Sequence, residues 1–186
     1  RPAFDSGENR VNFTSANSQF LSLAEQPFTG TIPRTVLAVV NVKSFPATSG
    51  AGFFSVKNYD GDPGNLDEYG AYWDLCIEEN KFVIRVRGND IFTLSVSTSQ
   101  DMLIVAQWES GSSSNSSVWH DGDSLAWSDG NSQTINAGVG TAEIGSTKLQ
   151  SDQYFDGYIY ELVVVKNTLT TLIRQKIEGY LAHKWG

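Results

Sequence analysis

A buried strand followed at once by a short amphipathic helix closes this chain of 186 residues, and this pairing restricts the possible folds more than any other feature. Residues 158–165 form an apolar run, with Asp-Gly just before it and Lys-Asn just after it. A run of this length between turn residues predicts a strand packed against a core. The fold must therefore combine this strand with a helix that comes directly after it.

The residues after the strand predict both the start and the buried face of that helix. Thr170 is a residue type that caps helix N-termini. Apolar residues then recur at helical spacing and form one stripe: Ile173, Ile177, Tyr180, Leu181 and Trp185. Gly179 weakens the helix, so we expect tertiary packing to hold it in place.

Short strand-like runs separated by turn residues extend along the whole chain. They cover residues 19–23, 35–42, 52–56, 71–77, 81–87, 91–96, 102–109, 118–120, 125–127, 142–144 and 158–165. This regularity predicts an all-β fold in which two antiparallel sheets pack as a sandwich. Several runs alternate apolar and polar residues, so one of their faces is buried. The run 35–42 is apolar on both sides, which predicts an inner strand whose outer face is covered by loops or by the terminal helix.

Length and composition limit the possible functions. A chain of 186 residues fits one domain, 1–186, and buries roughly 70% of its unfolded surface, so it needs no disulfide. Cys76, the single cysteine, is expected to be an inert core residue. Thirteen basic against twenty-one acidic residues give a net charge of −8, which argues against nucleic acid or an anionic membrane as partner. No apolar run approaches the length of a transmembrane helix.

The terminal segment, FDGYIYELVVV followed by RQKIEGYLAHKWG, resembles the end of laminin-G-like, concanavalin A-like domains of secreted bacterial and phage proteins. Weaker similarity covers NSQFLSL at 17–23, TIPRTVLAVVNV at 31–42, the hairpin VWHDGDSLAW at 118–127 and AEIGS at 142–146. The resemblance implies a two-sheet antiparallel jelly-roll β-sandwich with a short C-terminal helix, located outside the cell or on its surface. The chain starts with Arg1 rather than Met, so we expect a module of a larger protein.

Residues 58–70, NYDGDPGNLDEYG, are acidic and rich in turn residues. Five oxygen-bearing side chains fall within nine positions: Asp60, Asp62, Asn65, Asp67 and Glu68. Calcium prefers such oxygen ligands on a backbone that glycines allow to curl, and many laminin-G-like domains bind calcium at a rim of the sandwich. The EF-hand pattern is incomplete, and a solvated acidic turn explains the same composition. Calcium is therefore the predicted cofactor, with an ordinary turn as the alternative.

Aromatic residues surround the same segment. Tyr59, Tyr69 and Tyr72 are predicted to bind a glycan, because the C–H face of a pyranose stacks on aromatic rings while nearby polar groups bond its hydroxyls. Trp73 and Trp127 are expected in the core instead, since large aromatic side chains dominate sandwich interiors.

The hairpin at 118–127 supplies further candidates. Its Asp-Gly pair is explained by a tight turn, but the family's usual hairpin has an apolar residue where His120 stands. Trp119, His120 and Asp123 are therefore predicted to line a ligand groove. A metal site that joins His120 to His183 is less favoured, because two histidines far apart in sequence seldom suffice.

Arg85 and Arg87 alternate outward along the run 81–87 and, with Gln107 and Glu109, predict a polar strip on one sheet suited to an acidic polysaccharide. Simple solvation explains such a strip equally well. The paired carboxylates of sandwich glycosidases are absent from the sequence.

The predicted function is a non-catalytic extracellular carbohydrate-binding module for a polysaccharide. The first alternative is a protein-interaction or adhesion domain of a cell-surface or phage structural protein. A glycosidase or polysaccharide lyase is the second alternative.

Overall fold

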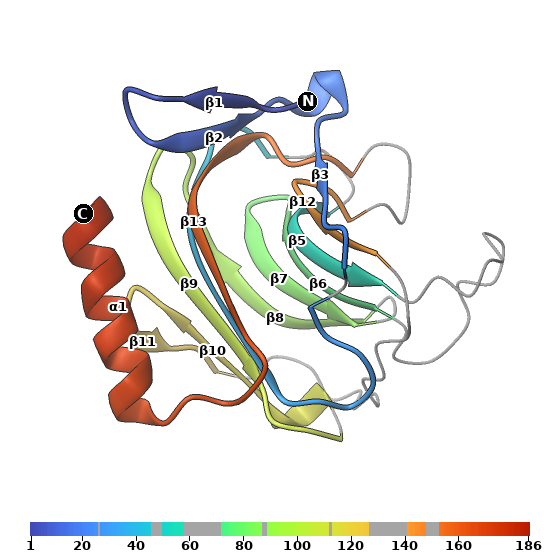
Figure 1. Ribbon diagram of the computed structural model, residues 1–186, viewed down its shortest axis with the longest axis vertical. Helices are drawn as coiled ribbons and strands as arrows, with labels where there is room; N and C mark the ends of the chain where they lie inside the picture. The colour runs from blue at the N-terminus through green and yellow to red at the C-terminus, as the bar shows by residue number, and fades with distance from the viewer. Residues whose placement is uncertain are drawn as a thin grey trace, which may run out of the picture.

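The computed structural model describes residues 1–25, 27–45, 50–57, 72–86, 89–111, 113–126, 141–147 and 153–186. Two antiparallel sheets face each other across an apolar interior, and a helix lies on the outer face of one of them (Figure 1). The predicted all-β jelly-roll sandwich with a short C-terminal helix is confirmed. No helix among the described segments is long and apolar enough to cross a membrane.

The seven-stranded sheet joins strands from both ends of the sequence. Its spatial order is β1 (Ala3–Asp5), β2 (Arg10–Phe13), β13 (Gly157–Val165), β4 (Arg34–Val42), β9 (Asp101–Trp108), β10 (Ser116–His120) and β11 (Asp123–Ser124). β13 pairs antiparallel with both β2 and β4, which places it inside the sheet as its apolar sequence requires. The sequence did not predict β1 and β2, because runs of three and four residues show no clear alternation.

The six-stranded sheet contains the middle of the chain. Its spatial order is β3 (Leu21–Ser22), β12 (Ala142–Ile144), β5 (Ala51–Lys57), β6 (Tyr72–Glu78), β7 (Lys81–Val86) and β8 (Asn89–Ser95). β5 to β8 pair with their neighbours in sequence, as a meander of hairpins does. The predicted runs in this region are therefore confirmed as strands.

Large apolar side chains fill the space between the sheets. Trp73 and Trp108 are fully buried, which confirms the prediction for Trp73, whereas Trp127 lies outside the described residues. Phe28 and Phe54 meet the Trp73 ring edge to face at centroid distances of 6.4 and 6.5 Å. Such pairs each add about 0.5–1.5 kcal/mol to the burial of the rings, so these contacts stabilise the interior of the sandwich.

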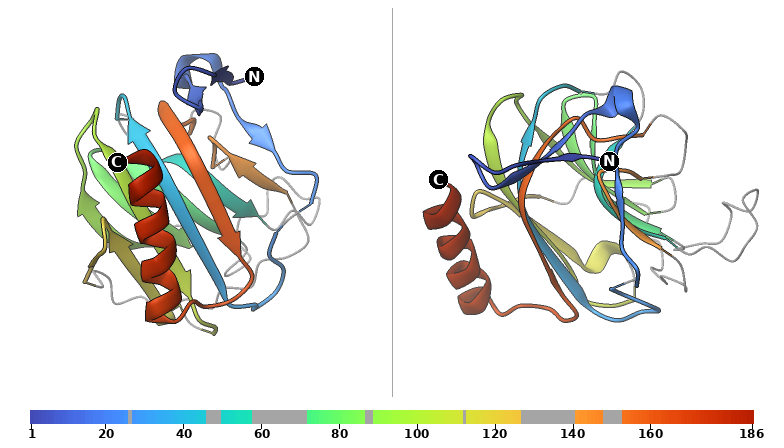
Figure 2. Two further views of the ribbon diagram at one scale, coloured as in Figure 1. Left: turned by 60° about the vertical axis from the view of Figure 1, so that its left-hand side comes forward. Right: turned by 45° about the horizontal axis from the view of Figure 1, so that its top comes forward.

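β4 is buried on both of its faces because α1 (Thr171–Trp185) covers the outer one (Figure 2). Val36 and Val40 face the interior between the sheets, while Leu37 and Val39 face outward. Leu181 of α1 is fully buried against that outward pair. The sequence expectation that the outer side of this strand is covered is confirmed, and the helix is what covers it.

The start of α1 is confirmed, but its predicted buried face is partly wrong. The Thr170 hydroxyl accepts a hydrogen bond from the Ile173 N–H at 3.4 Å, as an N-cap does. Ile173 and Tyr180, however, are 48% and 54% exposed. The helix instead buries Arg174 and Glu178 beside Leu181.

A buried ion pair explains this rotation of the helix. The Arg174 guanidinium donates to the Glu178 carboxylate one turn later and lies 4.2 Å from the centroid of the Trp119 ring. The aliphatic stem of an arginine covers apolar surface, and its charged end is attracted to the face of an indole ring. Arg174 therefore packs on the sheet as an apolar residue would.

Glu161 of β13 fixes the other end of the helix. Its Oε2 accepts hydrogen bonds from Lys184 Nζ and Trp185 Nε1, both at 2.8 Å. Burial alone raises the pKa of Glu161, but the bonds from Lys184 and Trp185 outweigh this effect and hold the pKa below its ordinary value. The last turn of α1 is thus tied to the sheet by charge-assisted hydrogen bonds.

Candidate functional site

The residues of the predicted calcium site lie outside the described residues, as do three of the predicted ligand-binding residues. They are Asp60, Asp62, Asn65, Asp67 and Glu68 of the calcium site, together with Tyr59, Tyr69 and Arg87. Among the residues that the structure describes, no group of three or more His, Cys, Asp or Glu side chains is arranged to hold a metal ion. Calcium binding therefore stays a prediction.

β6 begins where the predicted aromatic and acidic segment ends. Its first residue, Tyr72, pairs its backbone with Lys57 of β5. Trp73 and Leu75 face the interior, so the alternate residues Asp74 and Glu78 face outward from the six-stranded sheet. The predicted glycan-binding segment therefore leads directly, in sequence, into a strand of the six-stranded sheet.

Polar residues form a line across the outer face of the six-stranded sheet. The register places Glu143 of β12 opposite Ser55 of β5, Ser55 opposite Asp74 of β6, and Asp74 opposite Arg85 of β7. We call these four residues, together with Glu78, the polar row. The four residues of the line across the sheet are buried, whereas the Glu78 side chain is 28% exposed. Glu78 is thus the most accessible member of the polar row.

Hydrogen bonds fix the side chains of the polar row. The Ser55 hydroxyl donates to Asp74 Oδ1, and Arg85 Nη2 donates to Glu78 Oε2. A Cβ added at Gly50 would lie 2.9 Å from Arg85 Nη1 and 3.0 Å from Cys76 Sγ. The backbone at Gly50 therefore holds the guanidinium in place, and a larger residue there would displace it.

The predicted strip of Arg85, Gln107 and Glu109 on a single sheet is wrong. Arg85 belongs to β7 of the six-stranded sheet, while Gln107 belongs to β9 of the seven-stranded sheet. Gln107 is also buried, and its side-chain oxygen accepts hydrogen bonds from the Thr35 hydroxyl at 3.1 Å and the Leu169 N–H at 2.7 Å. Gln107 therefore holds the segment that leads into α1.

The polar row is unusually rich in charged groups for a set of mostly buried residues. Three buried or partly buried carboxyl groups and one guanidinium lie along this row, and burying charged groups costs free energy that apolar residues of similar volume would not. Polar residues retained against this cost often mark a functional site. The arrangement can offer an oriented carboxylate acceptor, that of Glu78, which the buried guanidinium of Arg85 holds in place.

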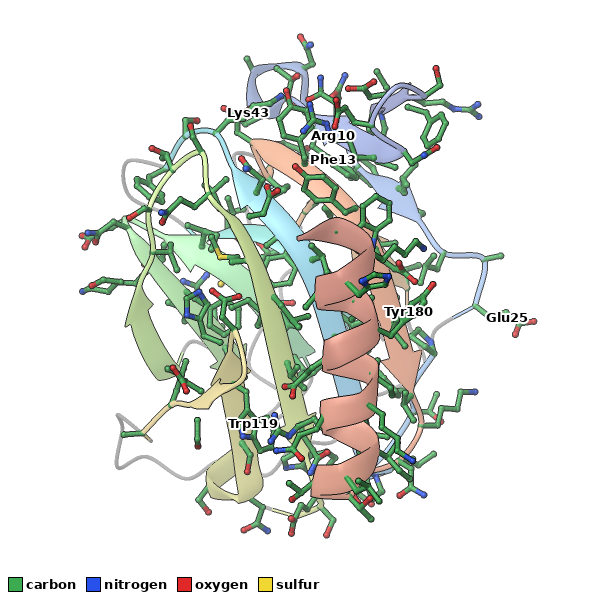
Figure 3. The ribbon with its side chains drawn as sticks, turned by 90° about the vertical axis from the view of Figure 1, so that its left-hand side faces the viewer. Arg10, Phe13, Glu25, Lys43, Trp119 and Tyr180 are labelled. Carbon is green, nitrogen blue, oxygen red and sulfur yellow. The ribbon has the colours of Figure 1, made fainter. Side chains whose placement is uncertain are left out.

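The hairpin residues lie on the other sheet. Trp119 is half-buried beneath Arg174 and packs in the cluster under α1, so its ring is a contact of the helix (Figure 3). His120 Nε2 lies 3.4 Å from Asp121 Oδ2, and its side chain is 28% exposed. Asp123 is exposed and lies opposite His120 in the β10–β11 pair. His120 and Asp123 are therefore surface residues on the seven-stranded sheet, away from the polar row.

Comparison with solved structures shows that the two-sheet β-sandwich fold of this chain also occurs in domains of several carbohydrate-active proteins. No known family model matches the sequence, and no curated protein sequence does. One similar structure is domain 4 of AbnA, an extracellular GH43 arabinanase from Geobacillus stearothermophilus, in complex with arabinotriose. The alignment covers 95% of this chain and 80% of that domain, with 12% identity and a TM-score of 0.66.

Sialidase domains from two bacteria show the same fold. The CBM40 domain of the Ruminococcus gnavus IT-sialidase, bound to α2,3-sialyllactose, aligns over 87% of this chain and 95% of that chain, with 16% identity and a TM-score of 0.59. The NanB sialidase of Streptococcus pneumoniae aligns over 91% of this chain and 27% of its own length, with 11% identity and a TM-score of 0.61. At these identities the similarity establishes the fold.

Proposed function

We propose that this domain is a non-catalytic carbohydrate-binding module that recognises a polysaccharide through the outer face of its six-stranded sheet. The single observation that carries this proposal is the polar row, fixed by hydrogen bonds beneath that face. The fold supports it, because the similar domains include an arabinanase domain in complex with arabinotriose and a module bound to sialyllactose. The extracellular location and the place in a larger protein belong to the same proposal.

Ligand recognition then combines the accessible end of the polar row with residues that follow β5 and β7 in sequence. Glu78 offers an acceptor for sugar hydroxyls and Arg85, buried beside it, holds its carboxylate, while Ser55, Asp74 and Glu143 form the floor beneath them. We assign ring stacking to Tyr59, Tyr69 and Tyr72, and a cationic contact to Arg87. We assign the ordering of the acidic segment to calcium, bound by the five side chains of the predicted calcium site. Trp119 is left out, because its ring packs beneath Arg174.

Catalysis is not part of the proposal, on geometric grounds. Asp74 and Glu78 lie four residues apart on β6, which separates them by about 13 Å along the strand. Retaining glycosidases need about 5–5.5 Å between two carboxyl groups and inverting ones about 6.5–9.5 Å. Glu143 and Asp74 are two strand spacings apart, about 10 Å, but both are fully buried, so a sugar bond does not reach between them.

The test is affinity electrophoresis of the domain in gels that contain plant, algal or bacterial polysaccharides, with calcium or with EDTA. We expect at least one polymer to retard the domain, and the variant Arg85→Lys to be retarded about tenfold less strongly, because a hydrogen bond to a charged group contributes about 1.5–3 kcal/mol and lysine lacks the planar fork. Arg1→Lys makes the same change at an exposed residue and is the control. Absence of retardation by every polymer, or equal retardation of both variants, would overturn the proposal.

One observation favours the second candidate, a protein-interaction domain. The outward side of α1 carries the exposed side chains of Leu172, Ile173 and Tyr180, which are 63%, 48% and 54% exposed. Clustered exposed apolar residues are typical of protein contacts. Loss of a captured partner on changing Tyr180 to Ser, combined with no polysaccharide binding, would favour this second function over the first.

A further inference from the structure

A cleft of about 130 Å³ lies between the C-terminal end of α1 and the beginning of β9. It lies beside α1, which covers the outer face of the seven-stranded sheet (Figure 2). The cleft is therefore on the side of the sandwich opposite to the polar row. At about 30 Å³ per water, this volume corresponds to about four water molecules. The cleft is therefore large enough for a single small ring and too small for several.

The floor of the cleft is apolar. Val39 of β4, Leu103 of β9 and Leu181 of α1 line it, and all three belong to the buried cluster beneath the helix. Trp185 forms one wall and is partly exposed. Its indole Nε1 donates to Glu161 Oε2 at 2.8 Å, so the orientation of the ring is fixed before any ligand arrives.

Two carboxylates stand at the rim, and both are held in place by the protein. Asp101 Oδ1 accepts hydrogen bonds from the Tyr160 hydroxyl at 2.8 Å and from Asn41 Nδ2 at 2.6 Å. Asp121 Oδ1 accepts one from the Leu103 N–H at 2.8 Å. Asp121 Oδ2 lies 3.4 Å from His120 Nε2, so the protein sets the positions of both carboxylates before a ligand binds.

The electrostatic character of the cleft is negative. None of its lining residues is basic, and the helix presents its C-terminal end there, where the partial charge of the helix dipole is negative. The last turn of α1 carries two basic residues, His183 and Lys184, and Lys184 donates to Glu161. Such a cleft attracts a cationic group, admits a neutral one and repels an anion.

We propose that this cleft is a second sugar subsite, which takes a single pyranose ring without negative charge and binds an amino sugar most strongly. The apolar face of the ring packs on Trp185 and the floor, while hydroxyl or ammonium groups donate to Asp101 and Asp121. This combination of an apolar wall with a few positioned polar groups is what small-ligand sites share. The choice of a sugar as ligand rests on the proposed function; the size and the charge preference rest on the cleft alone.

The experiment is titration of the ¹⁵N-labelled domain with glucosamine, methyl glucoside and glucuronate, followed by NMR of the Trp185 indole and the Leu103 and Gly186 amides. We expect all three signals to shift with glucosamine, less with methyl glucoside and not with glucuronate. Asp101→Asn keeps its hydrogen bonds to Tyr160 and Asn41 and should weaken glucosamine binding about tenfold. Glu25→Gln removes the same charge at an exposed site and should change nothing (Figure 3).

Equal shifts with ammonium chloride, or shifts elsewhere only, would overturn the second subsite. The two proposals fail separately. If only the cleft is assigned wrongly, polysaccharide retardation still depends on Arg85 and is unchanged in Asp101→Asn. If only the face of the polar row is assigned wrongly, the Trp185 signals still respond to glucosamine.

Discussion

The contact of α1 with the sheet yields a sharp prediction through Leu181. This side chain is fully buried between the helix and the outward side of the seven-stranded sheet. Its replacement by alanine removes three carbon groups, worth about 2.4 kcal/mol at about 0.8 kcal/mol each, and leaves part of the space unfilled. We therefore expect Leu181→Ala to lower the free energy of unfolding by about 3 kcal/mol, within the range of buried leucine-to-alanine changes.

Leu172 provides a matched control on the same helix. It is 63% exposed, so Leu172→Ala makes the same chemical change without opening a cavity and should cost less than about 0.5 kcal/mol. In thermal unfolding Leu181→Ala should melt about 6–12 °C below the parent domain and Leu172→Ala about 1 °C below it, since 1 kcal/mol corresponds to about 2–4 °C at this size. Equal melting temperatures for both variants would refute the assigned orientation of the helix.

Two further predictions concern other parts of the fold. The pKa of Glu161 is held below its ordinary value, so this group stabilises the fold above about pH 4.5 and loses that contribution as the pH falls through the lowered pKa. Glu161→Gln should therefore reduce the fall in melting temperature at acid pH. An unchanged fall in melting temperature would contradict this. Gly145 and Gly122 both have positive φ, but only at Gly145 would a Cβ meet another side chain, 2.3 Å from Phe13. Gly145→Ala should therefore lower the denaturation midpoint well below that of Gly122→Ala, whose cost is limited to backbone strain of about 1–3 kcal/mol; equal midpoints would count against the described packing.

The sequence predicts the strands well where hydrophobic runs are long. The run 35–42 is apolar on both sides and becomes the doubly covered β4. It does not predict that the residue just before this run, Arg34, is buried as well. The Arg34 guanidinium lies 5.0 Å from the Phe28 ring centroid and 4.7 Å from that of Trp108 and donates to backbone carbonyls, while burial lowers its pKa to about 10. Aromatic neighbours from distant segments make this possible, and a local pattern does not contain them.

The orientation of α1 shows how a local pattern misleads. Helical spacing of apolar residues favours burial of Ile173, but the sheet beneath the helix presents the ring of Trp119. Arg174 covers that ring and is neutralised by Glu178, so a charged pair occupies positions that the spacing gives to apolar residues. Tertiary context thus decides which face of this short helix is buried.

The candidate sites depend on register, which the sequence specifies only in part. Asp74 and Arg85 lie within a hairpin and alternate visibly, but Glu143 joins them only because β12 pairs with β5. In the hairpin at 118–127 a tight turn is enough to explain Asp121, and yet this residue also lines the cleft beside α1. A residue can form a turn and line a site at once, so a local explanation did not reveal the second role.

The measurement that tests the central claim most directly is hydrogen–deuterium exchange of the domain with and without a polysaccharide that retards it in gels. Binding at the outer face of the six-stranded sheet should slow amide exchange in β6 and β7, residues 72–86, independently of any change near the cleft beside α1. Protection confined to α1 or to the seven-stranded sheet would contradict the assigned face, and the same exchange with and without the polymer would contradict binding itself.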